Sequence, residues 1–272
     1  MARLSITTAW NETVAFIGRE AQLILPIAFL LLALPGAGLQ LVMPTPAPGV
    51  TPEFPPILLL LVPLAILAGM VGSIAITFLA LRPGRSVGEA LQRGLGRFLI
   101  LFAASLLIGL AALILFVPLL VLFAGGAALT GGATPAAAAG PMLLVFLIFL
   151  VVMITFWVRL LPMNAVAAAE DVGPIGIITR SWALTSGYFW KLLGFVLLLC
   201  LAAIIVSVAI SAVLGILLFL AAGPPEPGSV SMIVMMIVSA LIQSVLSAIF
   251  LTLIARIYAQ LAGGDDKSEV FA

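Results

Sequence analysis

Two adjacent carboxylates, Glu170 and Asp171, are the first candidates for chemistry in this sequence of 272 residues. Neighbouring acids bind Mg²⁺ or transfer protons when further groups complete the site. The chain has no histidine, and no third ligand or phosphate-cradling loop accompanies the pair. Pro174 suits the first turn of a helix, where nearby negative charge is favourable. We therefore expect the acids to stabilise a helix start, and we expect no catalytic residue, no metal ligand and no cofactor.

A second set of candidates combines basic and aromatic side chains next to long apolar runs. Arg93 precedes one run, and Arg180, Trp182 and Lys191 precede another. All four tryptophans and both tyrosines lie in comparable places, as in the aromatic belts that anchor membrane proteins. Anchoring is therefore one interpretation. The other is a surface that binds lipid headgroups or a partner protein, formed by Arg93, Arg180, Trp182 and Lys191.

Inside the apolar runs, polar side chains are few. Gln243, Ser244 and Ser247 are the best candidates for an intramembrane polar site. Serine at such positions usually lets helices approach closely, whereas an ionisable group inside a membrane marks a transport path or a proton relay. Residues 98–158 contain no ionisable acid or base. The sequence therefore offers little for a proton relay in the middle of the chain.

Membrane-spanning helices must position these candidates. Hydrophobic residues make up 64% of the chain and charged residues 8%, against roughly 25% charged in a soluble domain. A bilayer core needs ~20 apolar residues per helix, and runs of that length exclude the alternating strands of an outer-membrane barrel. The sequence predicts an all-α fold, a polytopic transmembrane helical bundle in a single domain, 1–272. Its six predicted spans are residues 21–43, 56–81, 98–124, 141–163, 192–222 and 229–262.

The basic residues predict the orientation of these spans. All eleven Lys and Arg lie at or beyond the span ends that face one side, and none lies in the three loops of the other side. Because positive charge is retained in the cytoplasm, we expect a bacterial inner-membrane protein with both termini cytoplasmic. We interpret residues 21–43 as a retained first span and not a signal peptide. Without a dense basic run, nucleic-acid binding has no support.

Three segments that precede odd-numbered spans resemble one another. Residues 6–10, Ile-Thr-Thr-Ala-Trp, match residues 178–182, Ile-Thr-Arg-Ser-Trp, and Arg93 lies close to midway between them. Each segment has an apolar stripe at helical spacing and a polar opposite face, as in helices that lie in the headgroup plane. We predict three repeats, each of one interfacial helix and two spans. The alternative is that the segments resemble one another by chance, because all are rich in apolar residues. The predicted bounds of the repeats are residues 1–81, 82–163 and 164–264.

One stretch also resembles a known family. Residues 168–174 and 178–191 contain an acid, a Gly-Pro turn, an Arg-Ser-Trp helix and a Gly-aromatic-Trp start to a span. This pattern is similar to the glycerophosphoryl diester phosphodiesterase membrane domain, a family of bacterial six-span proteins of undefined role. Members named for the enzyme carry a separate soluble phosphodiesterase domain. The resemblance therefore implies the membrane half only, and it carries no catalytic residue over to this chain.

These patterns favour a non-catalytic protein. We expect a scaffold or accessory factor in envelope or phospholipid homeostasis, which contacts membrane lipids and a membrane or cytoplasmic protein partner. The alternative is a transporter or lipid-handling protein with a path between spans that are kinked at Pro26, Pro63 and Pro118. A hydrated cavity that reaches Gln243 would favour transport.

The orientation predicts which positions react with a membrane-impermeant thiol reagent. Cysteines introduced at Thr51, Thr130 and Ser229 should label from outside intact cells, because the loops that hold them lack Lys and Arg. A cysteine at Ser268 should react only after the cells are broken. Labelling of Ser268 in intact cells would contradict the predicted topology.

Overall fold

The structure is a computed structural model in which helices make up almost all of the described residues and no strand occurs among them. This result confirms the all-α prediction. Thr51 and Thr130 lie outside the described part of the chain. The described ranges are residues 4–43, 54–129, 135–223 and 229–269.

The first span is continuous with the segment that precedes it. Helix α1 (Ile6–Ile27) begins after Ser5, whose hydroxyl accepts a hydrogen bond from the backbone N–H of Thr8. It continues through a π-helical segment, η1 (Ala28–Ala33), into α2 (Leu34–Val42). Pro26 lies just before η1 and removes one intrahelical hydrogen bond, a common cause of such irregularities. The predicted first interfacial helix is therefore not a separate element.

The second and third spans form a hairpin, and the first helix of this hairpin is α3 (Leu58–Leu81). Gly84, at a φ of 86°, allows the tight turn into α4 (Val87–Leu129). Ser86 caps α4 by accepting a hydrogen bond from the backbone N–H of Glu89. No break separates the predicted second interfacial helix from its span, because residues 87–129 form one continuous helix.

The second half of the chain contains a short helix that the sequence analysis did not predict. Seven residues form α6 (Met163–Ala169), which follows α5 (Pro135–Arg159) and precedes α7 (Pro174–Thr185). Helix α7 begins at Pro174 as predicted, and Gly187, at a φ of 85°, separates it from α8 (Phe189–Ala222). The last helix is α9 (Val230–Glu269).

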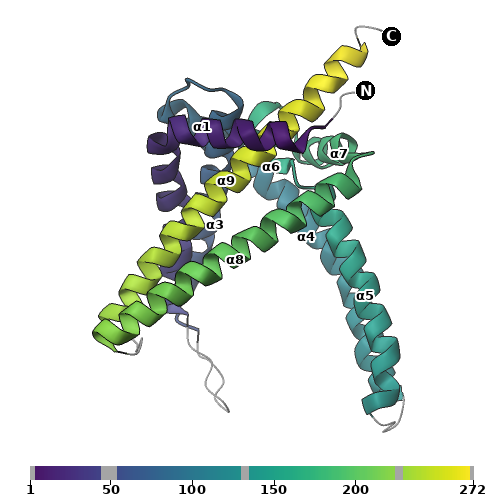
Figure 1. Ribbon diagram of the computed structural model, residues 1–272. Helices are drawn as coiled ribbons and strands as arrows, with labels where there is room; N and C mark the ends of the chain where they lie inside the picture. The colour runs from purple at the N-terminus through teal and green to yellow at the C-terminus, as the bar shows by residue number, and fades with distance from the viewer. Residues whose placement is uncertain (1–3, 44–53, 130–134, 224–228, 270–272) are drawn as a thin grey trace.

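Six helical segments are long and apolar enough to cross a membrane, one for each predicted span. Figure 1 shows the start of α1, helix α7 and the C-terminal end of α9 at one end of the molecule. From there α4 and α5 diverge from α8 and α9, so the bundle is splayed (Figure 1). The six segments are Ile6–Val42, Leu58–Leu81, Val87–Pro118, Phe146–Ala169, Phe189–Ala221 and Val230–Gly263.

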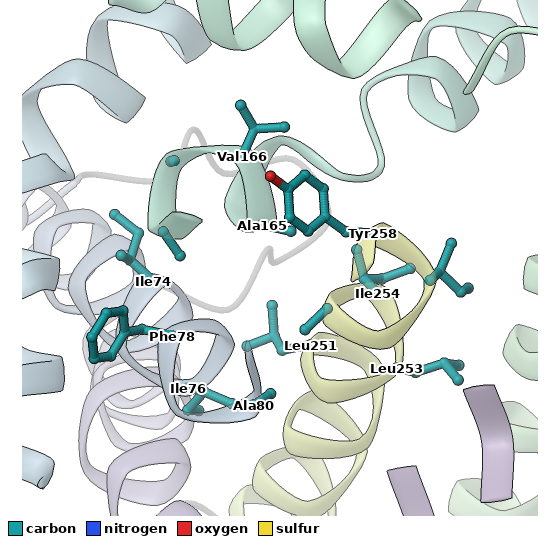
Figure 2. Close-up of a cluster of buried hydrophobic side chains, with 14 of the residues drawn as sticks. Ile74, Ile76, Phe78, Ala80, Ala165, Val166, Leu251, Leu253, Ile254 and Tyr258 are labelled. Atoms are coloured by element: carbon teal, nitrogen blue, oxygen red, sulfur yellow. The ribbon is translucent and has the colours of Figure 1, made fainter. Parts of the chain in front are cut away.

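The buried core lies at the closed end of this splayed bundle. All ten residues 71–80 of α3 are buried, as are Ala165 and Val166 of α6. Figure 2 shows how side chains of α3, α6 and α9 converge there, with Ile74, Val166 and Ile254 among them. By contrast, most of the apolar side chains described in α8 are exposed. Close packing is therefore concentrated around α6.

Close approach of α3 and α4 generates a prediction about Gly94. A Cβ atom at Gly94 would lie 2.7 Å from the carbonyl oxygen of Val71, whereas one at Gly96 would meet nothing within 4 Å. Gly94→Ala should therefore destabilise the protein by about 1–3 kcal/mol through overpacking. Gly96→Ala should be neutral or stabilising by up to ~1 kcal/mol, because alanine favours helix. Thermal unfolding in detergent micelles measures both, and equal melting temperatures would show that α3 and α4 do not pack this closely.

Candidate functional site

Arg97 holds the C-terminal end of the buried helix α6. Its Nε donates to the carbonyl oxygen of Ala167 at 3.3 Å, and its Nη2 donates to those of Glu170 and Val172, each at 2.7 Å. The last carbonyls of a helix have no intrahelical partners, and leaving such a group buried and unpaired costs about 1–3 kcal/mol. Arg97 supplies the missing donors from α4. It therefore allows α6 to end inside the core.

Arg93 lies one turn before Arg97 on α4 and completes this cap. Its Nε donates to the carbonyl oxygen of Ala168 at 3.0 Å, and its Nη1 binds Asp171 Oδ1 at 2.7 Å. This hydrogen bond lowers the pKa of the Asp171 carboxyl, and the nearby charges of Arg93, Arg97 and Arg82 lower it further. Because the folded-state pKa is depressed, the stability from this pair is fully present above the ordinary carboxyl pKa and is lost as the pH falls from there through the lowered value. Asp171 is 79% exposed, so solvent weakens the contribution.

Glu170 connects α6 to two further helices. Its Oε1 accepts a hydrogen bond from Tyr258 of α9 at 2.7 Å and lies 3.2 Å from Nε of Arg180 on α7. The adjacent acids therefore pair with different helices, Asp171 with α4 and Glu170 with α7 and α9. They do lie just before the start of α7, as expected, but their closest contacts are arginines and a tyrosine. Within the described ranges, no three His, Cys, Asp or Glu side chains group closely enough to hold a metal ion.

The four residues of the predicted headgroup or partner surface occupy different environments. Arg93 and Arg180 bind the two acids. Trp182 instead lies under the guanidinium of Arg159, with Cζ 5.3 Å from the ring centroid. Lys191 lies farther along, with Nζ 6.0 Å from the centroid of the Tyr188 ring. Sequence reasoning missed the central role of Arg97, although its position four residues after Arg93 places both on one helical face.

The predicted intramembrane polar residues lie outside the two large pockets of the described part of the chain. Gln243 is exposed, Ser247 is partly buried, and Ser244 is buried. The Ser244 hydroxyl donates to the Leu241 carbonyl oxygen of its own helix at 2.7 Å. None of the three lines the two large pockets described next. The arrangement gives no support to a transport path through Gln243.

The first large pocket, here called the apolar pocket, lies between α3, α4 and α5. Its volume is about 640 Å³, and its walls include Gly69 and Ser73 of α3, Ser105 of α4 and Phe156 of α5. Both serine hydroxyls donate to carbonyls of their own helices, each at 2.9 Å. Asn164, near the start of α6, adds an amide to a lining that is otherwise mostly apolar. The pocket therefore suits an apolar ligand with a polar end.

The second large pocket, here called the arginine pocket, lies beyond the other end of α6. Its volume is about 550 Å³, and it lies along the turn between α3 and α4. Helix α6 thus contributes its first residues to the apolar pocket, while the arginines that hold its last carbonyls line the arginine pocket. The residues that line the arginine pocket are Phe78, Arg82, Arg85, Glu89, Gln92, Arg93, Gly96, Arg97 and Asp171.

Six long apolar helical segments, the fourth of which ends with the arginine-capped helix α6, define a multi-pass helical membrane protein. A family model described as a domain of unknown function (DUF7847) matches residues 4–261. The chain therefore belongs to this family. The searches of curated proteins and of solved structures gave no match.

The capping of α6 predicts that replacing Arg97 lowers the stability of the protein more than replacing Arg85, which lies in the same hairpin. Arg97→Gln should destabilise the protein by about 3 kcal/mol, because one buried carbonyl and two partly buried carbonyls lose their charged donor. Arg85→Gln should change stability by less than ~1 kcal/mol, because Arg85 forms an exposed ion pair with Glu89. Unfolding of the purified variants in detergent checks this difference. Similar losses for both would show that the α6 carbonyls do not depend on Arg97.

Proposed function

We propose that this protein is a non-catalytic accessory protein of the bacterial inner membrane that acts in phospholipid or envelope homeostasis by holding a membrane lipid. The apolar pocket carries this proposal. Its volume of about 640 Å³ falls within the range of ~300–1,000 Å³ typical of ligand sites. Its apolar walls between spans match an acyl chain, and the Asn164 amide can bind a polar group at the end of that chain.

The chemistry of the lining favours a lipid over a transported ion or polar solute. Ser73 and Ser105 already bond to their own helices, so the pocket offers few polar partners that a hydrophilic solute would need. Among the described residues that line it, none is Asp, Glu, Lys or Arg. A lipid tail requires no such partner, and it covers apolar side chains that the splayed helices leave without protein contacts.

The basic residues support an orientation with both termini in the cytoplasm. In that orientation the arginine pocket faces the headgroup layer of the cytoplasmic leaflet, where anionic lipids concentrate. The resemblance to the glycerophosphoryl diester phosphodiesterase membrane domain is consistent with a role close to phospholipids. The three-repeat organisation remains part of this proposal, with α7 as a separate interfacial helix and the first turns of α1 and α4 in the corresponding places.

A scaffold for a protein partner is the second candidate function. Trp190 at the start of α8 and Ile175 at the start of α7 are 79% and 68% exposed. Trp190 adjoins Lys191 in sequence, and Ile175 shares α7 with Arg180. Exposed apolar side chains on segments that also carry basic residues suit either the headgroup layer or a partner surface. Recovery of one protein at a fixed ratio to this chain, lost when Trp190 and Ile175 are changed to serine, would favour the scaffold.

Filling the apolar pocket should displace its lipid. Gly69 lines the pocket, and a Cβ atom there would meet nothing within 4 Å. Gly69→Phe should therefore reduce the phospholipid that copurifies with the gently extracted protein from near-stoichiometric to a small fraction. Native mass spectrometry of the full chain measures the bound lipid.

Gly109→Phe is the matched control, because Gly109 also has open space around it but lies outside the pocket lining. It should retain as much lipid as the unchanged protein. Equal lipid retention in both variants, with both monodisperse and folded, would contradict the proposal.

A further inference from the structure

We infer that the arginine pocket is a binding site for a phosphate-bearing anion. This inference rests on the proposed function, because it specifies the headgroup of the lipid that the protein would hold. Four arginines line the pocket against two carboxylates, Glu89 and Asp171. Both acids are already engaged, Glu89 with Arg85 at 3.2 Å and Asp171 with Arg93 at 2.7 Å. The described lining therefore carries two more positive charges than negative ones.

Arg97 provides the first unmatched group. Its Nε and Nη2 donate to backbone carbonyls, whereas its Nη1 lies 3.8 Å from Asp171 Oδ1, beyond hydrogen-bonding distance. The Arg97 side chain is only 10% exposed. A nearly buried guanidinium that lacks an anionic hydrogen-bond partner is unfavourable. An anion in the pocket would supply that partner.

Arg82 provides the second guanidinium group without an anionic partner among the described residues. Within the described residues it pairs with no carboxylate, and its Cζ lies 5.4 Å from the ring centroid of Phe78. Phe78 is itself buried and lines the pocket. This cation–π contact holds the guanidinium at the pocket wall without neutralising it. Arg82, the residue that follows α3, and Arg97 of α4 thus offer two guanidinium groups to one ligand.

Guanidinium groups favour phosphate because their planar N–H pairs match its oxygens in a bidentate geometry. The amide of Gln92 adds a neutral donor to the lining. A volume of about 550 Å³ leaves room for a headgroup larger than the phosphate alone. The same chemistry would accept a phospholipid headgroup or a soluble phosphate monoester.

Two glycines of α4 allow the pocket charge to be changed with a matched control. Gly96 lines the pocket, and a Cβ atom there meets nothing within 4 Å. Gly88 is eight residues earlier on the same helix, is exposed and lies outside the lining. Gly96→Glu adds a carboxylate to the site, whereas Gly88→Glu adds the same charge nearby. Arg82→Gln and Arg19→Gln form a second pair, because Arg19 is exposed and lies outside the lining.

The first arm measures headgroup preference. The full chain in detergent is mixed with equal amounts of phosphatidylglycerol and phosphatidylcholine that have identical acyl chains, and native mass spectrometry gives the ratio bound. The unchanged protein should prefer phosphatidylglycerol. Gly96→Glu and Arg82→Gln should each reduce that preference by about tenfold, the effect of losing one charged hydrogen bond. Gly88→Glu and Arg19→Gln should leave it nearly unchanged.

The second arm titrates delipidated protein with inorganic phosphate in a calorimeter. Saturable phosphate binding that Gly96→Glu removes and Gly88→Glu retains would support the site. If the first arm also shows no headgroup preference, the ligand is a soluble phosphate ester and not a lipid. No headgroup preference together with no phosphate binding would overturn the inference. Equal effects of Gly96→Glu and Gly88→Glu would also overturn it, because they would indicate only general electrostatics. Total lipid retention, which depends on the apolar pocket, reports separately on the proposed function.

Discussion

The arrangement of the other helices depends on how the short helix α6 ends inside the core of the protein. Helix α6 has four consecutive buried residues, Ala165 to Ala168, and it ends at Ala169. Its last carbonyls therefore have no N–H partners from a following helical turn. Such carbonyls need donors where water is excluded. Arg97 and Arg93 provide them from α4, 70 and 75 residues away in sequence for their Nε bonds. These bonds, with those of Glu170, bring α4, α6, α7 and α9 to one place.

This concentration of polar contacts explains why the bundle is tight at one end and open at the other. Where α6 is clamped, α3 and α9 bury long stretches of side chain. Beyond it, α4 and α5 diverge from α8 and α9 (Figure 1), and association there depends on van der Waals packing in lipid. A helix that divides an apolar pocket from a cationic one separates two kinds of chemistry, which matches the two parts of an amphiphile.

Much of the fold could be predicted from the sequence, because apolar length identifies spans directly. The start of α7 at Pro174 was also predictable, since proline suits a first helical turn. Helix α6 was not, because seven residues rich in alanine carry no period that separates them from the end of a span. The pairs Arg93–Asp171 and Tyr258–Glu170 join residues 78 and 88 apart, and no local pattern reports such contacts. The interfacial helices were predicted as three separate elements, yet two continue without a break into their spans, because no turn residue interrupts them.

The most direct test of the central claim is a cryo-electron microscopy map of the full chain in nanodiscs made from native bacterial lipids. We expect elongated density in the apolar pocket between Gly69 and Ser105, with its polar end near Asn164. We also expect a splayed bundle with α6 held by Arg97. A bundle that closes so that protein side chains fill the pocket, with no lipid density there, would contradict lipid holding.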